Sequence, residues 1–265
     1  MDHTLTGTIR LHKALESRFV EKSRDVIVYL PPDYNETDGR HPVLYLHDGQ
    51  NLFDAATAFA GNDWGLDELA EELIQKREIQ PIIIVGIYNA GEQRMAEYTH
   101  VRDRRGRGGR AKAYARFLLE DLKPFIDSEY RTLPDSTNTG LGGSSLGGLV
   151  TLYLGLHHPD AFGKLIVMSP SIWWANRAIL REVRKLRASL PQKIWLDIGT
   201  CEGQNPDACV KNAKDLADAL VAKGWRPEQD FKFVEDFGAG HDEKAWGYRM
   251  RDALKFLFPP APAPQ

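Results

Sequence analysis

Short apolar runs alternate with longer amphipathic stretches along most of the chain, and this alternation restricts the possible fold more than any other feature. The runs are rich in β-branched and aromatic residues, as strands are, and lie at 26–32, 42–49, 82–89, 164–170, 193–200 and 231–237. Other stretches carry apolar residues at helical spacing, at 62–76, 114–130, 176–190, 205–224 and 242–258. Strands that alternate with helices predict an α/β fold, with a mostly parallel central sheet and helices on both faces. The segment 7–17 is expected to pair antiparallel with the first run at one edge of the sheet.

Length and composition narrow the class of protein. The 265 residues suffice for one large α/β domain, which we expect at 1–258, followed by a flexible proline-rich tail at 259–265. A formal net charge of −3 gives no reason to expect nucleic acid or a membrane as a partner. Cys201 and Cys209 are too few for a disulfide scaffold or a zinc site, and we expect no metal or organic cofactor. No apolar run reaches the ~20 residues of a membrane helix and no secretory signal is visible, so a cytoplasmic protein is expected.

The stretch GLGGSSLGGL at 140–149 carries the strongest chemical signal. A linker is disfavoured because a helical pattern follows at once, and neither a dinucleotide-binding nor a P-loop spacing is present. Gly143, Ser145 and Gly147 satisfy G-x-S-x-G, the nucleophile elbow, in which a serine sits on a strained turn between a strand and a helix. The residues two before and two after that serine come into contact, so both must be glycine. With Ser144 at the apex one flank would be Leu146, and the pattern therefore favours Ser145 as the nucleophile.

A serine nucleophile in this arrangement needs an acid and then a histidine further along the chain. His241 follows the last expected strand and is the favoured general base. The acid is expected in the loop after the run 193–200, where Glu202 lies. Asp207, in the first turn of the next helix, is the reserve, and Asp197 lies inside the strand itself.

Several segments in this order resemble the esterase D and enterochelin-esterase-like branch of the α/β-hydrolases, which includes feruloyl esterases and mycolyltransferases. They are VIVYLPPDY, PVLYLHDGQNLFD, LKPFIDSEYRT, GGSSLGGL, MSPSIWW, IGTCEG and GAGHDEKAW, spread from near residue 20 to near residue 258. The resemblance implies an α/β-hydrolase fold, with Ser145 as nucleophile, His241 as base and Glu202 as acid. It also implies an oxyanion hole built from the backbone N–H groups of Gln50 and Leu146.

Two features depart from this resemblance. The run 137–143, before the serine, has few β-branched residues for a central strand. The segment Arg102–Arg110, RDRRGRGGR, is longer and more basic than the connection expected there. It can be read as a solvated loop, as a lid that holds an anionic substrate, or as a contact for RNA, although the rest of the chain is not basic.

These patterns predict a serine carboxylic-ester hydrolase that works through a Ser-His-Glu triad and an acyl-enzyme, with a small-molecule ester as its substrate. Trp64, Tyr88, Trp173 and Trp174 lie just beyond strand ends or at one, and are candidates for the pocket wall. Aromatic walls suit aryl or sugar-linked esters, and siderophore esters are equally open. The alternatives are an acyltransferase with the same triad and a non-catalytic binding module that contacts anionic ligands through Arg102–Arg110.

Overall fold

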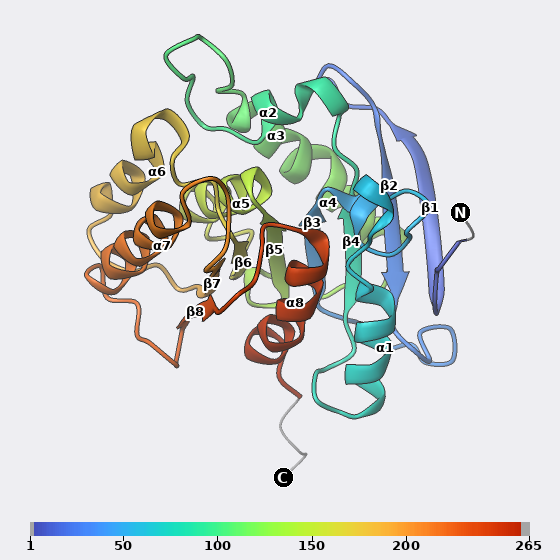
Figure 1. Ribbon diagram of the computed structural model, residues 1–265. Helices are drawn as coiled ribbons and strands as arrows, with labels where there is room; N and C mark the ends of the chain where they lie inside the picture. The colour runs from blue at the N-terminus through green and yellow to red at the C-terminus, as the bar shows by residue number, and fades with distance from the viewer. Residues whose placement is uncertain (1–2, 261–265) are drawn as a thin grey trace.

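Eight strands form one sheet in the computed structural model, which describes residues 3–260 (Figure 1). The strands are β1 Thr8–Leu15, β2 Arg24–Leu30, β3 Val43–His47, β4 Ile83–Ile87, β5 Thr139–Ser144, β6 Lys164–Met168, β7 Lys193–Gly199 and β8 Phe231–Asp236. Their order is β1-β2-β4-β3-β5-β6-β7-β8. β1 pairs antiparallel with β2 and β2 with β4, and each later pair is parallel. The predicted mostly parallel sheet and its antiparallel edge are confirmed.

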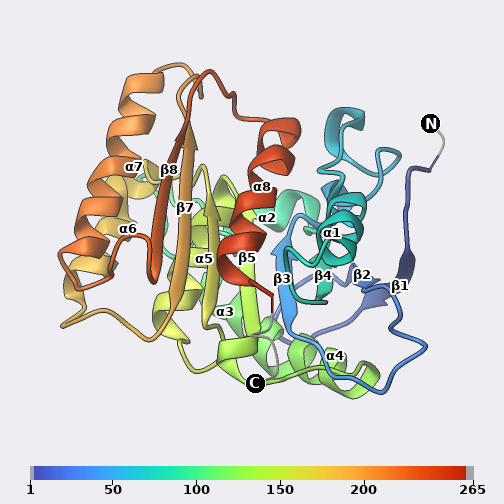
Figure 2. The ribbon, with the colours of Figure 1, turned by 90° about the horizontal axis from the view of Figure 1, so that it is seen from below.

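Helices cover both faces of this sheet (Figure 2). They are α1 Leu66–Gln75, α2 Arg94–Glu97, α3 Ala111–Arg116, α4 Lys123–Glu129, α5 Leu146–His157, α6 Trp174–Lys185, α7 Pro206–Val221 and α8 Glu243–Leu257. The core on one face contains residues of α3 to α7, and the core on the other face contains residues of α1 and α8. In β4, Ile83 and Val85 belong to the first core and Ile84 to the second, because successive strand residues point to opposite faces.

The glycine-rich strand β5 lies in the middle of the sheet, between β3 and β6. A Cβ atom on Gly142 would lie 2.8 Å from side-chain carbons of both Leu46 and Ile166. Because bulky side chains of the neighbouring strands already fill this space, β5 needs small residues where a central strand usually carries β-branched ones. This packing explains why the pattern at 137–143 is weak.

The strand order reverses at β3, since β4 lies on one side of it and β5 on the other. In open α/β sheets such a reversal leaves a crevice beyond the carboxyl ends of the two strands, and ligands bind there. The loop that begins at Asp48 leaves β3 at this point, and Ser145 directly follows β5. The topology therefore places both segments at one crevice.

The C-terminal end of the chain is described only in part. Helix α8 ends at Leu257, and residues 261–265 of the expected tail lie outside the described residues. Among the helices of residues 3–260, none is long and apolar enough to cross a membrane.

Candidate active site

Ser145 stands on a sharp turn between β5 and α5. Its φ of 58° and ψ of −119° lie outside the regions that residues other than glycine usually occupy. The Ser145 N–H donates to the Met168 carbonyl at 3.0 Å, and the Ser145 carbonyl accepts from the Ser171 N–H at 3.0 Å. Both partners belong to the end of β6 and the loop after it, so the neighbouring strand holds the serine in its strained conformation.

Glycines on either side of Ser145 allow the backbone to close up. A Cβ atom on Gly143 would lie 3.2 Å from the carbonyl carbon of Gly147, which is the contact expected from the G-x-S-x-G pattern. A Cβ atom on Gly148 would lie 2.7 Å from the Met168 carbonyl oxygen, so this glycine lets α5 pack directly on β6.

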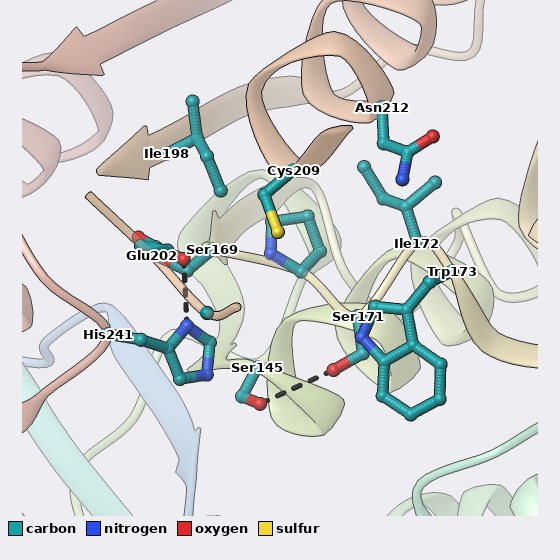
Figure 3. A pocket seen from close by; sticks show the side chains of 12 residues that line it. Ser145, Ser169, Ser171, Ile172, Trp173, Ile198, Glu202, Cys209, Asn212 and His241 are labelled. Atoms are coloured by element: carbon teal, nitrogen blue, oxygen red, sulfur yellow. Dashed lines mark hydrogen bonds and ion pairs between the residues drawn. The ribbon is translucent and has the colours of Figure 1, made fainter. Parts of the chain in front are cut away.

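His241 and Glu202 meet beside Ser145 although they are 39 residues apart. Glu202 lies in the loop after β7 and His241 in the loop after β8, and the parallel strands bring these loops to the same edge. His241 Nδ1 lies 2.7 Å from Glu202 Oε2. The His241 side chain is 37% exposed and that of Glu202 is 3% exposed, so the imidazole faces the cavity and the acid lies behind it. Figure 3 shows the imidazole between Glu202 and Ser145.

The two other candidate acids have different surroundings. Asp197 is buried in β7, where its Oδ2 accepts a hydrogen bond from the Trp195 indole at 2.7 Å. Burial raises the pKa of Asp197 to about 6, against the opposing effect of Arg249. Asp207 is exposed in the first turn of α7. Of the three acids, Glu202 is the one hydrogen-bonded to His241.

A buried arginine of α8 holds the carboxylates behind His241. Arg249 Nη2 lies 3.6 Å from Glu202 Oε1, and its Nε lies 3.1 Å from Asp197 Oδ1. The same Nη2 donates to the Ser169 hydroxyl at 2.8 Å, and this hydroxyl donates to Glu202 Oε1. The Gly199 N–H donates to that oxygen at 2.6 Å. Glu202 is thus fixed by a cation and two hydrogen-bond donors on the side away from His241.

Neither Arg249 nor Ser169 stands out in the sequence patterns above. One signal does exist for Arg249, which lies three residues after Trp246 and four before Ala253, on the buried stripe of α8. An arginine in such a stripe needs an acidic partner in the core. Within residues 3–260, no group of three or more His, Cys, Asp or Glu side chains is arranged to hold a metal ion.

The backbone segments that carry Gln50 and Leu146 both border the crevice. Leu146 is the first residue of α5, and the first N–H groups of a helix have no acceptor within it. Gln50 lies in the 3-10 turn Gly49–Asn51, which follows Asp48. Two N–H groups of Arg94 donate to the Asp48 carboxylate, each at 2.7 Å, so this turn is anchored from the side. Gln50 lines one cavity together with Ser145.

Two cavities open onto Ser145 and His241, and their linings differ. The first has a volume of about 200 Å³ and reaches Glu202 (Figure 3). Its remaining wall is mainly apolar and includes Pro170, Ile172, Trp173, Ile198 and Cys209. The second has a volume of about 390 Å³ and is bordered by two aromatic residues, Phe59 and Trp246, and otherwise by polar ones, which include Asp48, Gln50, Asn51, Asn89, Arg94 and Glu243. One side of the serine therefore suits an apolar group and the other a hydroxylated or charged one.

Of the four aromatic residues predicted for the pocket wall, Trp173 lines the first cavity and is 59% exposed. Trp174 is 1% exposed, and its indole donates to the Val101 carbonyl at 2.8 Å. Trp64 is 6% exposed and belongs to the core under α8, while Tyr88 packs against that core and lines neither cavity. Trp64, Tyr88 and Trp174 line neither of the two cavities beside Ser145, because residues beyond strand ends fill the core as well as the pocket.

The sheet topology, the strained serine at a strand end and the surrounding helices define an α/β-hydrolase fold. The model of the family described as "Putative esterase" matches residues 17–257, so the chain belongs to this esterase family and is a carboxylic-ester hydrolase.

Two curated relatives match over most of their length. The uncharacterized protein YbbA of Bacillus subtilis is 27% identical over 264 residues, which cover 96% of this chain and 97% of that protein. The ferri-bacillibactin esterase BesA of the same organism is 30% identical over 226 residues, which cover 76% of this chain and 73% of that protein.

Solved structures share the fold. The BES protein from Bacillus cereus has a TM-score of 0.75 at 23% identity, with 97% of each chain covered. An IroE-like serine hydrolase from Shewanella oneidensis has a TM-score of 0.76 at 22% identity, with 95% of this chain and 80% of that chain covered.

Proposed function

We propose that the protein is a serine esterase that cleaves its substrate through Ser145, His241 and Glu202 and forms an acyl-enzyme on Ser145. The proposal is carried by one observation: a serine in a strained turn and a hydrogen-bonded His–Glu pair line the same cavity, each from a different strand end. A strained elbow and a buried acid behind a histidine have no evident value to a domain that only binds.

Each member of the triad has a distinct part in the proposed reaction. The Ser145 hydroxyl attacks the ester carbonyl while His241 Nε2 takes its proton. Glu202 accepts the Nδ1–H of His241, which keeps Nε2 available as an acceptor and stabilises the imidazolium that forms. His241 then gives the proton to the departing alcohol, and the acyl group stays on Ser145. In the second half, His241 takes a proton from the water that attacks the acyl-enzyme, and it gives this proton to Ser145 Oγ as the bond to the acyl group breaks and the acid leaves.

The carbonyl oxygen becomes negatively charged at each tetrahedral stage. We assign its stabilisation to the backbone N–H groups of Leu146 and Gln50. A donor of this kind contributes on the order of 3 kcal/mol to the transition state. The Arg94–Asp48 pair holds the Gln50 turn in place before substrate arrives, so little reorganisation is needed during the reaction.

The two cavities support a substrate with chemically different halves. An aryl or aliphatic group suits the apolar cavity, and an alcohol or amide-rich group suits the polar one. The names of relatives support siderophore esters as one class, since they include a ferri-bacillibactin esterase and an iron(III) salmochelin esterase. A relative named endo-1,4-beta-xylanase/feruloyl esterase supports aryl esters of sugars as another.

Fluorophosphonate labelling with peptide mapping tests the proposed nucleophile. We expect one adduct, on Ser145, that is lost in Ser145→Ala and strongly reduced in His241→Ala. Ser144→Ala is the matched control, because Ser144 is the adjacent serine and is buried at the end of β5. An adduct on Ser144, or a folded protein that neither reacts nor hydrolyses 4-nitrophenyl butyrate, contradicts the proposal.

A further inference from the structure

The basic segment Arg102–Arg110 forms one side of a hollow near the candidate active site. The hollow has a volume of about 670 Å³. Figure 1 shows the segment as the green loop between α2 and α3, above α6. Four arginines border the hollow, and its other lining residues are Val101, Asp103, Ala175 and Asn176. The four are Arg102, Arg104, Arg105 and Arg181, and we call this site the arginine hollow.

The cations of the arginine hollow are not neutralised by the protein. Within residues 3–260, none of its four arginines has a carboxylate oxygen within 4.0 Å, whereas Arg107 pairs with Asp103 and Arg110 with Glu21. The Asp103 carboxylate that borders the hollow is therefore already paired. Since the whole chain carries a formal net charge of −3, the positive charge here is a local feature and not part of a generally basic surface.

The loop that presents these arginines has a defined shape. Asp103 Oδ1 accepts hydrogen bonds from the N–H groups of Arg105 and Arg107, each at 2.9 Å. A Cβ atom on Gly108 would lie 2.6 Å from the ring of Trp174, so the loop packs directly on that indole. A loop that is ordered before binding loses less conformational entropy when it takes up a ligand.

The arginine hollow adjoins the catalytic cavity. Trp173 lines the catalytic cavity and Ala175 lines the hollow, and residues two apart in a chain have Cα atoms within roughly 7 Å of each other. The Ser171 hydroxyl lies 3.3 Å from Ser145 Oγ. Ala175 lies four positions after Ser171, and such a segment spans at most ~14 Å. A substrate of moderate length can therefore reach both sites.

We propose that the arginine hollow binds an anionic group of the ester substrate, a carboxylate or a phosphate carried at the end remote from the scissile bond. This inference rests on the proposed function and names a substrate class for the same site. Guanidinium groups pair with carboxylate and phosphate oxygens in a two-pronged geometry, and four of them at one hollow favour a group with more than one oxygen.

Two esters that differ only in the remote charge test this. One is the 4-nitrophenyl monoester of decanedioic acid, and the other carries a methyl ester on its far carboxyl group. We expect wild-type KM to be about threefold to tenfold lower for the charged ester, with similar kcat, because exposed ion pairs are individually weak. The difference should shrink in high salt. The corresponding pair built on hexanedioic acid, whose far carboxyl group extends less far from the scissile bond, should show a smaller difference.

The double variant Arg104→Gln/Arg105→Gln should lose the preference for the charged ester and keep wild-type kinetics on the methylated one. Arg184→Gln/Arg187→Gln is the matched control, since it removes the same charge from exposed positions that do not line the hollow. It should keep the preference.

Three results overturn the inference while esterase activity stands. The first is equal wild-type KM values for the two long esters, and the second is an equal loss of the preference for the charged ester in the two double variants. The third is unchanged ester kinetics in Arg104→Gln/Arg105→Gln together with loss of single-stranded RNA binding. The last result would assign the hollow to nucleic acid. Hydrolysis of neither ester by the wild type would contradict the proposed function itself, and the inference would fall with it.

Discussion

Replacement of Arg249 by methionine tests how the buried network supports His241, the proposed catalytic base. Methionine keeps an apolar stem of similar length and removes the cation. Two unit charges 3.6 Å apart, the separation between Arg249 Nη2 and Glu202 Oε1, interact by about 5 kcal/mol at an effective dielectric constant of ~20. Asp197 and Asp236 share the same guanidinium, so we assign on the order of 2 kcal/mol of this attraction to stabilisation of the ionised form of Glu202.

Without the cation, the ionised form of Glu202 loses this stabilisation and its carboxylate is held less firmly behind His241. The acid limb of the kcat/KM profile should therefore move toward higher pH in Arg249→Met, measured on a neutral 4-nitrophenyl ester. Activity at neutral pH should fall about tenfold and recover in mildly alkaline buffer. Arg249→Lys retains a positive charge and should keep part of the wild-type profile.

Stability is the necessary control, because an unpaired buried carboxylate costs about 3–5 kcal/mol. The pKa of Asp197 is already raised to about 6 by burial and would rise further without Arg249. The double variant Arg249→Met/Asp197→Asn removes this charge and should regain much of the lost Tm while the pH profile stays displaced. A folded Arg249→Met enzyme with the wild-type pH profile would refute the reasoning. Full recovery of activity at neutral pH in the double variant would show that the arginine acts on folding alone.

Three further predictions follow from other parts of the structure. Burial raises the pKa of Asp67 to about 8, far above the ~4 of an aspartate in an unfolded chain. Between these two pH values the native state holds a proton that the unfolded state releases, so the stability of the fold falls as the pH rises. Asp67→Asn should raise Tm in mildly alkaline buffer and leave it unchanged near pH ~4; an equal gain at both pH values would contradict this cause. Gly148→Ala should destabilise the protein by about 1–3 kcal/mol and reduce fluorophosphonate labelling, because its Cβ would press on a carbonyl of β6. Gly39→Ala is the control, because the new Cβ atom there meets no atom closer than 3.7 Å, and it should change neither stability nor labelling. Equal denaturation midpoints for the two variants would show that the contact with β6 is not the cause. Trp173→Ala should raise KM for aryl esters about fivefold with little change in Tm, since the ring is exposed at the cavity; an unchanged KM would mean that substrate does not contact the indole.

Local patterns in the sequence were sufficient for much of the fold. The apolar run 82–89 predicted a strand, and β4 forms there and contributes to the cores on both sides of the sheet. The G-x-S-x-G spacing predicted a tight turn with Ser145 at its apex, and Gly143 and Gly147 do approach each other there. Such features depend on residues a few positions apart, so the periodicity and the backbone preferences of glycine are enough to reveal them.

The sequence by itself determined the class of fold, the tight turn at Ser145 and the two loops that carry Glu202 and His241. Only the tertiary structure decided which acid contacts His241, that Arg249 from α8 lies behind that acid, and that Trp174 is buried while its neighbour Trp173 lines a cavity. The physical reason is that a position at a strand end specifies an edge of the sheet but not the direction of a side chain. That direction depends on helices and loops that are distant in the chain, and their packing is a property of the whole fold.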